Sequence, residues 1–155
     1  MNHKLLIALE RGETSQKVAD YVARACADAR GPNTKLVLYT MLPGLPAWVE
    51  SGESADASTQ RDKVEDEKRA EAAQCLAEVR QYLVAHGVED GLIVEEIADE
   101  TPWKVADILA TAKRYECGTI VMARHHKSMV AEFFAGDTEE KLLRHPTGFT
   151  VWLVE

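Results

Sequence analysis

The run KLLIAL at residues 4–9 is short, apolar at consecutive positions and bounded by polar residues. Runs rich in leucine and β-branched residues at this length predict strands. Consecutive apolar positions, in place of alternation, are typical of a strand buried on both faces of a parallel sheet. Four more candidate strands follow: residues 35–40 (KLVLYT), 92–97 (LIVEEI), 119–123 (TIVMA) and 149–154 (FTVWLV).

The stretches between these runs are long enough for the helical crossovers that parallel neighbours require. Three of them carry apolar stripes at helical spacing: Val18, Tyr21, Val22, Ala25 and Ala29; Ala72, Leu76, Val79 and Leu83; and Val105, Ile108, Leu109 and Ala112. The charged stretch 61–71 before the second stripe predicts a solvated helix face. Asp137 followed by Glu140 forms a capping-box pattern and predicts a fourth, shorter helix.

The alternation of strands and helices predicts an α/β fold: an open, doubly wound sheet of five parallel strands with helices on both faces. Right-handed crossovers give the strand order 3-2-1-4-5, with the reversal between the first and fourth strands. Ligands of such sheets bind at the carboxyl ends of the strands, where the order reverses. The loops expected to form a ligand site are therefore residues 10–14 and 123–136.

The composition indicates one globular domain, residues 1–155. Apolar residues make up 46% of the chain and charged residues 28%, which excludes a disordered or low-complexity protein. Residues 42–58 are rich in Pro, Gly, Ser and acidic residues, so we expect them to form a mobile loop. Trp48, in this loop, is expected to fold back onto the domain.

The charge balance excludes a broad attraction for nucleic acid or an anionic membrane. Eighteen Lys and Arg residues against 26 Asp and Glu residues give a net charge of −8. The longest apolar run near the start, residues 5–9, is far shorter than the roughly 20 residues of a membrane span and too short for a signal peptide. We therefore expect a cytoplasmic protein. Its three cysteines, Cys26, Cys75 and Cys117, are expected to be buried, reduced thiols.

Three segments together resemble the universal stress protein family. They are LLIALERGETSQKVADYVARACA at residues 5–27, TPWKVADILATAKRYECGTIVMA at 101–123, and FAGDTEEKLLRHPTGFTVWLV at 134–154. Their order and spacing match the family's first strand and helix, third helix and fourth strand, and last helix and strand. The resemblance implies an adenine-nucleotide alpha-hydrolase-like fold, and Glu10 stands where family members usually have Asp.

The resemblance also identifies a degenerate nucleotide motif. Family members that bind ATP carry G-x2-G-x9-G-[ST] after the fourth strand, and that spacing here falls on Ala123, His126, Gly136 and Asp137. Only Gly136 matches. A like-charge pair between Asp137 and a phosphate about 4 Å away costs roughly 4 kcal/mol, on the order of a thousandfold in affinity. The chain therefore looks like the universal stress protein A-like branch, which lacks the motif, and no ATP or other cofactor is expected.

A basic run, Arg124 to Lys127, borders the predicted crevice of this acidic chain. Its cations and imidazoles could hold a phosphate or carboxylate in place of the missing glycines. The alternative is a solvated loop whose charges offset Glu132, Asp137 and Glu139. Tyr39 or Met122 could fill the adenosine position. A metal site at His125 and His126 with His145 or Cys117 is not expected, because adjacent histidines on an extended segment point to opposite sides.

No pattern of catalytic residues is present, so an enzyme is not expected. Ser15 and Ser128 lack a nucleophile-elbow sequence, and Glu10 lacks a partnered second acid. The resemblance implies a non-enzymatic regulatory or stress-response protein that dimerises and docks to an unknown protein partner. The alternative is a nucleotide or anion sensor using Glu10, the basic run and Gly136.

The last strand is the expected dimer interface. In this topology it lies at a sheet edge, where unpaired amides and apolar side chains invite association. Pairing the edge with its twofold copy satisfies both. The interface residues are expected to be Phe149, Val151, Trp152 and Leu153.

Overall fold

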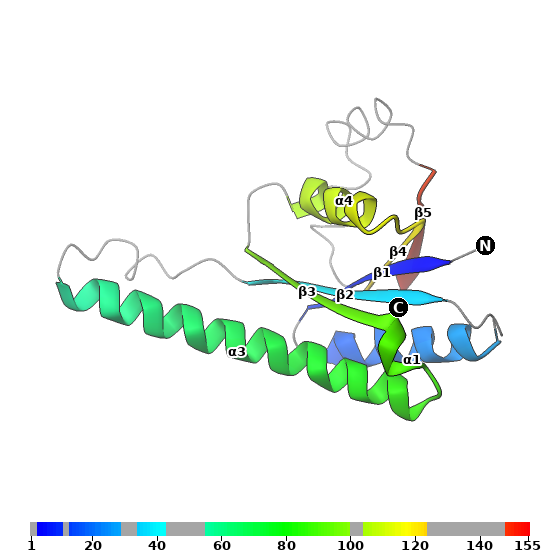
Figure 1. Ribbon diagram of the computed structural model, residues 1–155, viewed down its shortest axis with the longest axis horizontal. Coiled ribbons are helices and arrows are strands. Elements are labelled where there is room, and N and C mark those ends of the chain that lie inside the picture. The colour runs from blue at the N-terminus through cyan, green and yellow to red at the C-terminus, as the bar shows by residue number, and fades with distance from the viewer. Residues whose placement is uncertain (1–2, 11–12, 29–33, 43–54, 100–103, 124–147) are drawn as a thin grey trace.

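Five parallel strands form one sheet in the computed structural model of the chain (Figure 1). The strands are β1 (Lys4–Ala8), β2 (Lys35–Leu42), β3 (Ile93–Asp99), β4 (Thr119–Ala123) and β5 (Thr150–Val154). They lie in the order β3-β2-β1-β4-β5, and every neighbouring pair is parallel. The expected fold class and strand order are confirmed. The structure describes residues 3–10, 13–28, 34–42, 55–99, 104–123 and 148–155.

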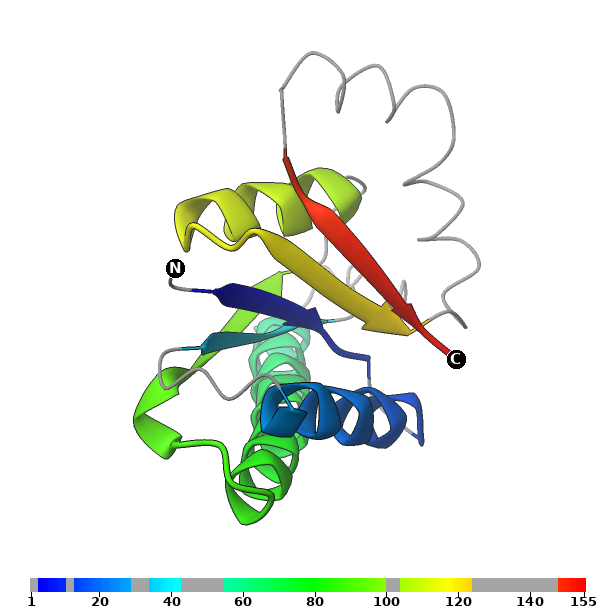
Figure 2. The ribbon, with the colours of Figure 1, turned by 90° about the vertical axis from the view of Figure 1, so that its right-hand side faces the viewer.

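Helices cover both faces of the sheet, as expected. Helices α1 (Glu13–Asp28) and α3 (Ala55–Ala85) lie on one face, and α4 (Lys104–Arg114) lies on the other (Figure 2). A short 3-10 turn, η1 (Asp90–Leu92), leads into β3. The two faces carry separate apolar cores, with Leu36 and Leu38 of β2 in the first and Val37 and Tyr39 in the second.

The strands differ in burial according to their place in the sheet. The apolar residues of β1, β2 and β4 are buried on both faces almost throughout, as consecutive apolar runs predict. The outer strands β3 and β5 have exposed positions, among them Val94 and Leu153. An outer strand has a neighbour on one side alone, so fewer atoms cover it.

The apolar stripe predicted for the first helix is wrong in part. Val18 and Val22 are buried as expected, but Ala19 and Ala23 complete the buried face. Tyr21 is 44% exposed, and Ala29 lies outside the described residues. The two alanines present little bulk to the sheet, so the helix is rotated to place them inward. The ring of Tyr21 instead meets Trp152 edge to face.

The boundaries of the predicted loop 42–58 are also wrong. Leu42 ends β2, and α3 already begins at Ala55, because the charged stretch and the second apolar stripe form one helix of 31 residues. Residues 43–54, including Trp48, lie outside the described residues. The stripe Ala72, Leu76, Val79 and Leu83 is buried as predicted, and the charged stretch is largely exposed.

Helix α3 ends in a Schellman motif. The N–H of Val88 donates to the carbonyl of Leu83 at 3.0 Å, and the N–H of Gly87 donates to that of Val84 at 3.1 Å. Gly87 has φ +96°, a conformation that glycine adopts without penalty. This turn sends the chain into η1 and β3.

The cysteines are free, but the expectation that all are buried is wrong for two of them. Cys117 is buried, whereas Cys26 and Cys75 are half-buried on α1 and α3. Both lie at the edge of a helix stripe, where solvent still reaches part of the side chain. The helix expected from Asp137 onward lies outside the described residues.

Candidate functional site

The strand order reverses between β1 and β4, as expected. Their pairing ends where Ala8 stands beside Met122. Because the two strands are parallel, the segments that follow them leave the sheet at the same edge. In open α/β sheets, ligands bind in the crevice outside such a point.

The end of β1 is held against β2. The N–H of Leu9 donates to the carbonyl of Tyr39 at 2.7 Å, and Oγ1 of Thr40 donates to the carbonyl of Leu9 at 2.9 Å. Thr40 is buried, so its hydroxyl satisfies a carbonyl that solvent does not reach. These two hydrogen bonds position the backbone from which Glu10 leaves the sheet. Sequence reasoning missed Thr40, although a hydroxyl at the carboxyl end of an apolar run was the available signal.

Glu10 and Ala123, both expected in the ligand site, lie at this edge. Glu10 is exposed one residue beyond Leu9, and Ala123 is the buried last residue of β4. A carboxylate at this end of a doubly wound sheet can accept hydrogen bonds from the hydroxyl groups of a ribose. The small side chain of Ala123 leaves the backbone after β4 more accessible than a larger residue would.

Met122 and Tyr39 belong to the core. Both side chains are at most 1% exposed and pack in the apolar cluster between the sheet and α4. They flank Ala8 from β2 and β4, two residues before Glu10.

The hydroxyl group of Tyr39 has no hydrogen-bond partner among the described residues. Burial and, after it, the nearby carboxylate of Asp107 together raise the pKa of Tyr39 to about 12. Thr111 on α4 lowers the pKa of Tyr39 through a hydrogen-bonding interaction, although its hydroxyl already donates to the carbonyl of Asp107 at 2.8 Å and no well-aligned hydrogen bond joins it to Tyr39. Tyr39 therefore stays neutral at physiological pH.

The remaining candidate ligand residues, Arg124, His126, Lys127, Gly136 and Asp137, lie outside the described residues, as does His125. Whether the basic run binds an anion or is a solvated loop therefore stays a prediction.

The expected dimer residues lie on or beside β5, the outer strand next to β4. Leu153 is 39% exposed, and Val151 and Trp152 are half-buried. Phe149 packs against the core beneath α4. The ring of Trp152 lies edge-on to Tyr21 of α1, with 6.0 Å between centroids and an interplanar angle of 83°.

A polar cluster on β3 was missed by sequence reasoning. The hydroxyl of Tyr115 donates to Oε2 of Glu96 at 2.7 Å, and Arg114 donates to Oε1 of the same carboxylate. The Tyr115 hydrogen bond and, after it, Arg114 hold the pKa of Glu96 below its usual value, against the opposing effect of burial. The available signal in the sequence was the pair Glu95 and Glu96 inside a predicted strand. The residues that bind Glu96, Arg114 and Tyr115, lie far along the sequence, so the pattern did not point to them.

The described residues hold little that could act in catalysis or bind a metal. Burial raises the pKa of the Cys117 thiol to about 11, which keeps it protonated and unreactive. No group of three or more His, Cys, Asp or Glu side chains in the described ranges is arranged to hold a metal ion. Within the same ranges, no helix combines the length and apolar character of a membrane span.

Comparisons with family models and with solved structures point to the same family. The model of the universal stress protein family matches residues 1–154. A universal stress protein from Archaeoglobus fulgidus in complex with dAMP aligns over 100% of both chains, with 16% identity and a TM-score of 0.60. A member of that family from Burkholderia pseudomallei is 21% identical, with a TM-score of 0.61 over 99% of this chain and 96% of its own.

A universal stress protein in complex with cAMP is 18% identical, with a TM-score of 0.60 over 99% of this chain and 97% of its own. At these identities the structural likeness establishes the fold alone. No curated protein matches the chain significantly.

Proposed function

The chain belongs to the universal stress protein family, and from that premise we propose that it acts without catalysis, as a stress-response regulator that pairs with a second copy and docks to a protein partner. The observation that carries the proposal is the outer strand β5. It combines a sheet edge with the residues Thr150, Val151, Trp152, Leu153 and Val154, none of which is charged. Such an edge associates unless something covers it.

The backbone of β5 supports pairing with a twofold copy. The N–H of Thr150 donates to the carbonyl of Gly118 at 2.9 Å, so this residue's backbone faces β4. In a parallel strand alternate residues face opposite neighbours, which directs the N–H groups of Val151 and Leu153 toward the free edge. An antiparallel copy of β5 would accept hydrogen bonds from both.

A proline substitution tests this interface. Val151→Pro removes an outward N–H and leaves the hydrogen bonds to β4 in place, so light scattering is expected to report a monomer. The matched control is Val151→Thr, which keeps the N–H and the β-branched shape and is expected to remain a dimer. An unchanged dimer mass for Val151→Pro would overturn the interface.

The proposed absence of catalysis and of ATP binding rests on the residues at the crevice. Ala123, His126 and Asp137 each remove a feature on which the family's phosphate site depends, and the one buried thiol at the sheet, Cys117, is protonated. Calorimetry with millimolar ATP and Mg2+ is expected to show no binding. The combined reversal Ala123→Gly, His126→Gly and Asp137→Ser is expected to bind weakly, because backbone amides regain access to phosphate.

A second candidate function is a nucleotide or anion sensor at the same crevice. Similar structures contain dAMP and cAMP, and Glu10 and Ala123 share one edge of the sheet here. Arg124 and Lys127 would then replace the missing glycines as phosphate ligands. Mass spectrometry of the natively purified chain separates the two functions. A co-purifying nucleotide, or tight ATP binding by the unmodified chain, favours the sensor.

A further inference from the structure

The sheet has two outer strands, β5 and β3, and their edges differ in chemistry. Among the described strands, β5 is bonded to β4 alone and β3 to β2 alone. Both edges carry exposed apolar side chains, with Leu153 of β5 39% exposed and Val94 of β3 40% exposed. A chain that paired with copies of itself at both edges would extend into an open array. The exposed apolar side chains therefore do not explain why a copy would pair with one edge and not with the other.

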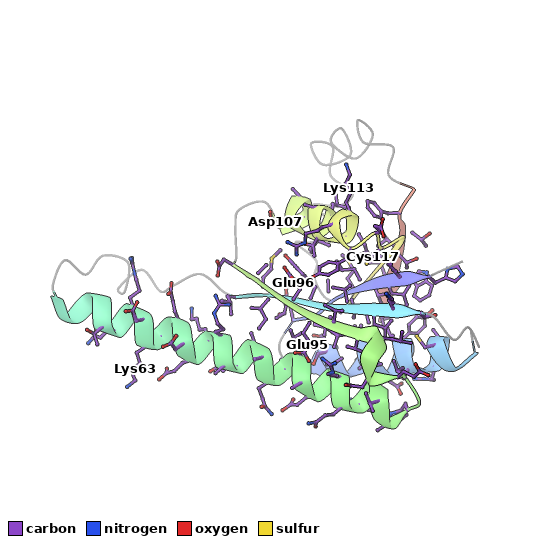
Figure 3. The ribbon with its side chains drawn as sticks, in the orientation of Figure 1. Lys63, Glu95, Glu96, Asp107, Lys113 and Cys117 are labelled. Carbon is purple, nitrogen blue, oxygen red and sulfur yellow. The ribbon has the colours of Figure 1, made fainter. Side chains whose placement is uncertain are left out.

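The two edges differ in charge. The strand β5, with sequence TVWLV, has no ionisable side chain, whereas β3, with sequence IVEEIAD, has three carboxylates. Glu95 and Glu96 lie on opposite faces of β3, toward α3 and α4 respectively (Figure 3). Both faces of the β3 edge therefore carry negative charge.

The register of a twofold pair brings these carboxylates together. Antiparallel pairing about Glu96 places Glu96 opposite its own copy, and pairing about Glu95 places Glu95 opposite its own copy. Pairing about Ile97 places Glu95 opposite Asp99 of the copy. Directly opposed side chains are about 5 Å apart at Cβ, where like charges destabilise a sheet. The same operation on β5 opposes neutral side chains alone.

Arginines from both helix layers hold these carboxylates without fully neutralising them. Arg80 of α3 lies 3.5 Å from Glu95 but donates its closest hydrogen bond, 2.6 Å, to Asp90. Arg69 of α3 lies 3.6 Å from Asp99. In the ion pairs of the described residues, three guanidinium groups, those of Arg69, Arg80 and Arg114, face four carboxylates, those of Asp90, Glu95, Glu96 and Asp99.

We propose that the carboxylates of β3 block this edge against a second copy, so that the chain associates through β5 alone and closes as a dimer. Glu95, Glu96 and Asp99 are then determinants of assembly. The proposal rests on the proposed pairing through β5, and the experiment below separates the two.

The test is the double variant Glu95→Gln with Glu96→Gln, which removes the charge and keeps the size of each side chain and one of its two acceptor oxygens. Glu65→Gln with Glu67→Gln, at exposed positions of α3, is the control for an equal change of net charge. Sedimentation velocity is expected to show a mass about twofold or more above the unmodified dimer, rising with concentration, for the β3 variant. The control is expected to keep the dimer mass.

Hydrogen exchange and a combined variant identify the surface that pairs. Amides of β3 are expected to exchange more slowly in the assembled β3 variant than in the unmodified chain, which excludes unspecific aggregation. Adding Val151→Pro to the β3 variant is expected to return the mass to that of a dimer, now paired through β3. If Val151→Pro alone stays dimeric, the β5 interface fails while the β3 exchange result still decides this proposal.

Unchanged mass and unchanged β3 exchange in the double variant would overturn the proposal. If the double variant loses its circular dichroism, the unmodified chain supplies the answer at high salt. In 1 M salt the screening length falls to about 3 Å, so the repulsion is removed and larger species protected at β3 are expected. A dimer mass at 1 M salt would then count against the proposal.

Discussion

At the scale of single residues, the hydroxyl of Tyr39 is the least satisfied polar group in the described part of the chain. A buried hydroxyl without a partner loses its hydrogen bonds to water and gains none in return. Tyr82 provides the contrast, because its hydroxyl donates to Oδ1 of Asp20 at 2.8 Å at the contact between α1 and α3.

Tyr39→Phe is therefore expected to raise the free energy of unfolding by about 1 kcal/mol, since it removes a polar group that the folded state does not satisfy. The matched change Tyr82→Phe is expected to lower it by about 1 kcal/mol, because a hydrogen bond to a carboxylate is lost. Urea titrations of the two variants and the unmodified chain make the comparison. A destabilised Tyr39→Phe would mean that the hydroxyl is hydrogen-bonded in solution, with Thr111 as the nearest candidate.

At the scale of elements, α4 ends in the same motif as α3 but without a glycine. The N–H of Cys117 donates to the carbonyl of Ala112 at 2.7 Å, and that of Glu116 donates to Lys113 at 3.1 Å. Glu116 occupies the left-handed position with φ +58°, where a Cβ is unfavourable. Its carboxylate lies 2.7 Å from the ammonium group of Lys4, at the amino-terminal end of β1.

Glu116→Gly is expected to raise the Tm by roughly 2–4 °C, because glycine takes this conformation without strain. The lost ion pair subtracts little, since Glu116 is highly exposed. Glu116→Ala is the control that loses the ion pair and keeps a Cβ, and it is expected to leave the Tm unchanged or slightly lower. Calorimetric scans that rank alanine above glycine would contradict the assignment of strain to this residue.

At the scale of the whole molecule, ion pairs tie both helix layers to the sheet and its connections. Arg80 of α3 holds Asp90, Arg114 of α4 holds Glu96, and Lys4 of β1 holds Glu116. Each of these carboxyl groups has a pKa below its ordinary value, chiefly because of a hydrogen bond from Arg80, Tyr115 and Lys4 respectively. The folded state therefore binds fewer protons than the unfolded chain in mildly acidic solution.

A lowered pKa makes stability depend on pH with a definite sign. The stabilisation is complete above the ordinary pKa values of 3.8 and 4.5, and it is lost as the pH falls through the lower values of the folded state. Urea midpoints are expected to be level from pH 7 to pH 6 and to fall below pH 4.5. Glu96→Gln is expected to make the fall shallower, and an equal fall in that variant would contradict the part assigned to Glu96.

The sequence by itself determined the elements and their order. A run such as TIVMA is short and apolar at consecutive positions, so its residues specify a strand without reference to any partner, and its burial then depends on its place in the sheet. The handedness of crossovers then restricts the order of the strands, and with it the point of reversal beside Glu10 and Ala123. These properties depend on neighbours along the chain and on rules common to all such sheets.

The tertiary structure alone decided the rotation of α1, the start of α3, and the partners of the polar side chains. Thr40 reaches Leu9 across 31 positions and Tyr115 reaches Glu96 across 19, while the hydroxyl of Tyr39 makes no well-aligned hydrogen bond among the described residues. A hydrogen bond depends on separations of a few tenths of an ångström, which are set only when the helices pack against the sheet. The helix and strand propensities of the residues do not determine those distances, because they depend only on the few residues on either side along the chain.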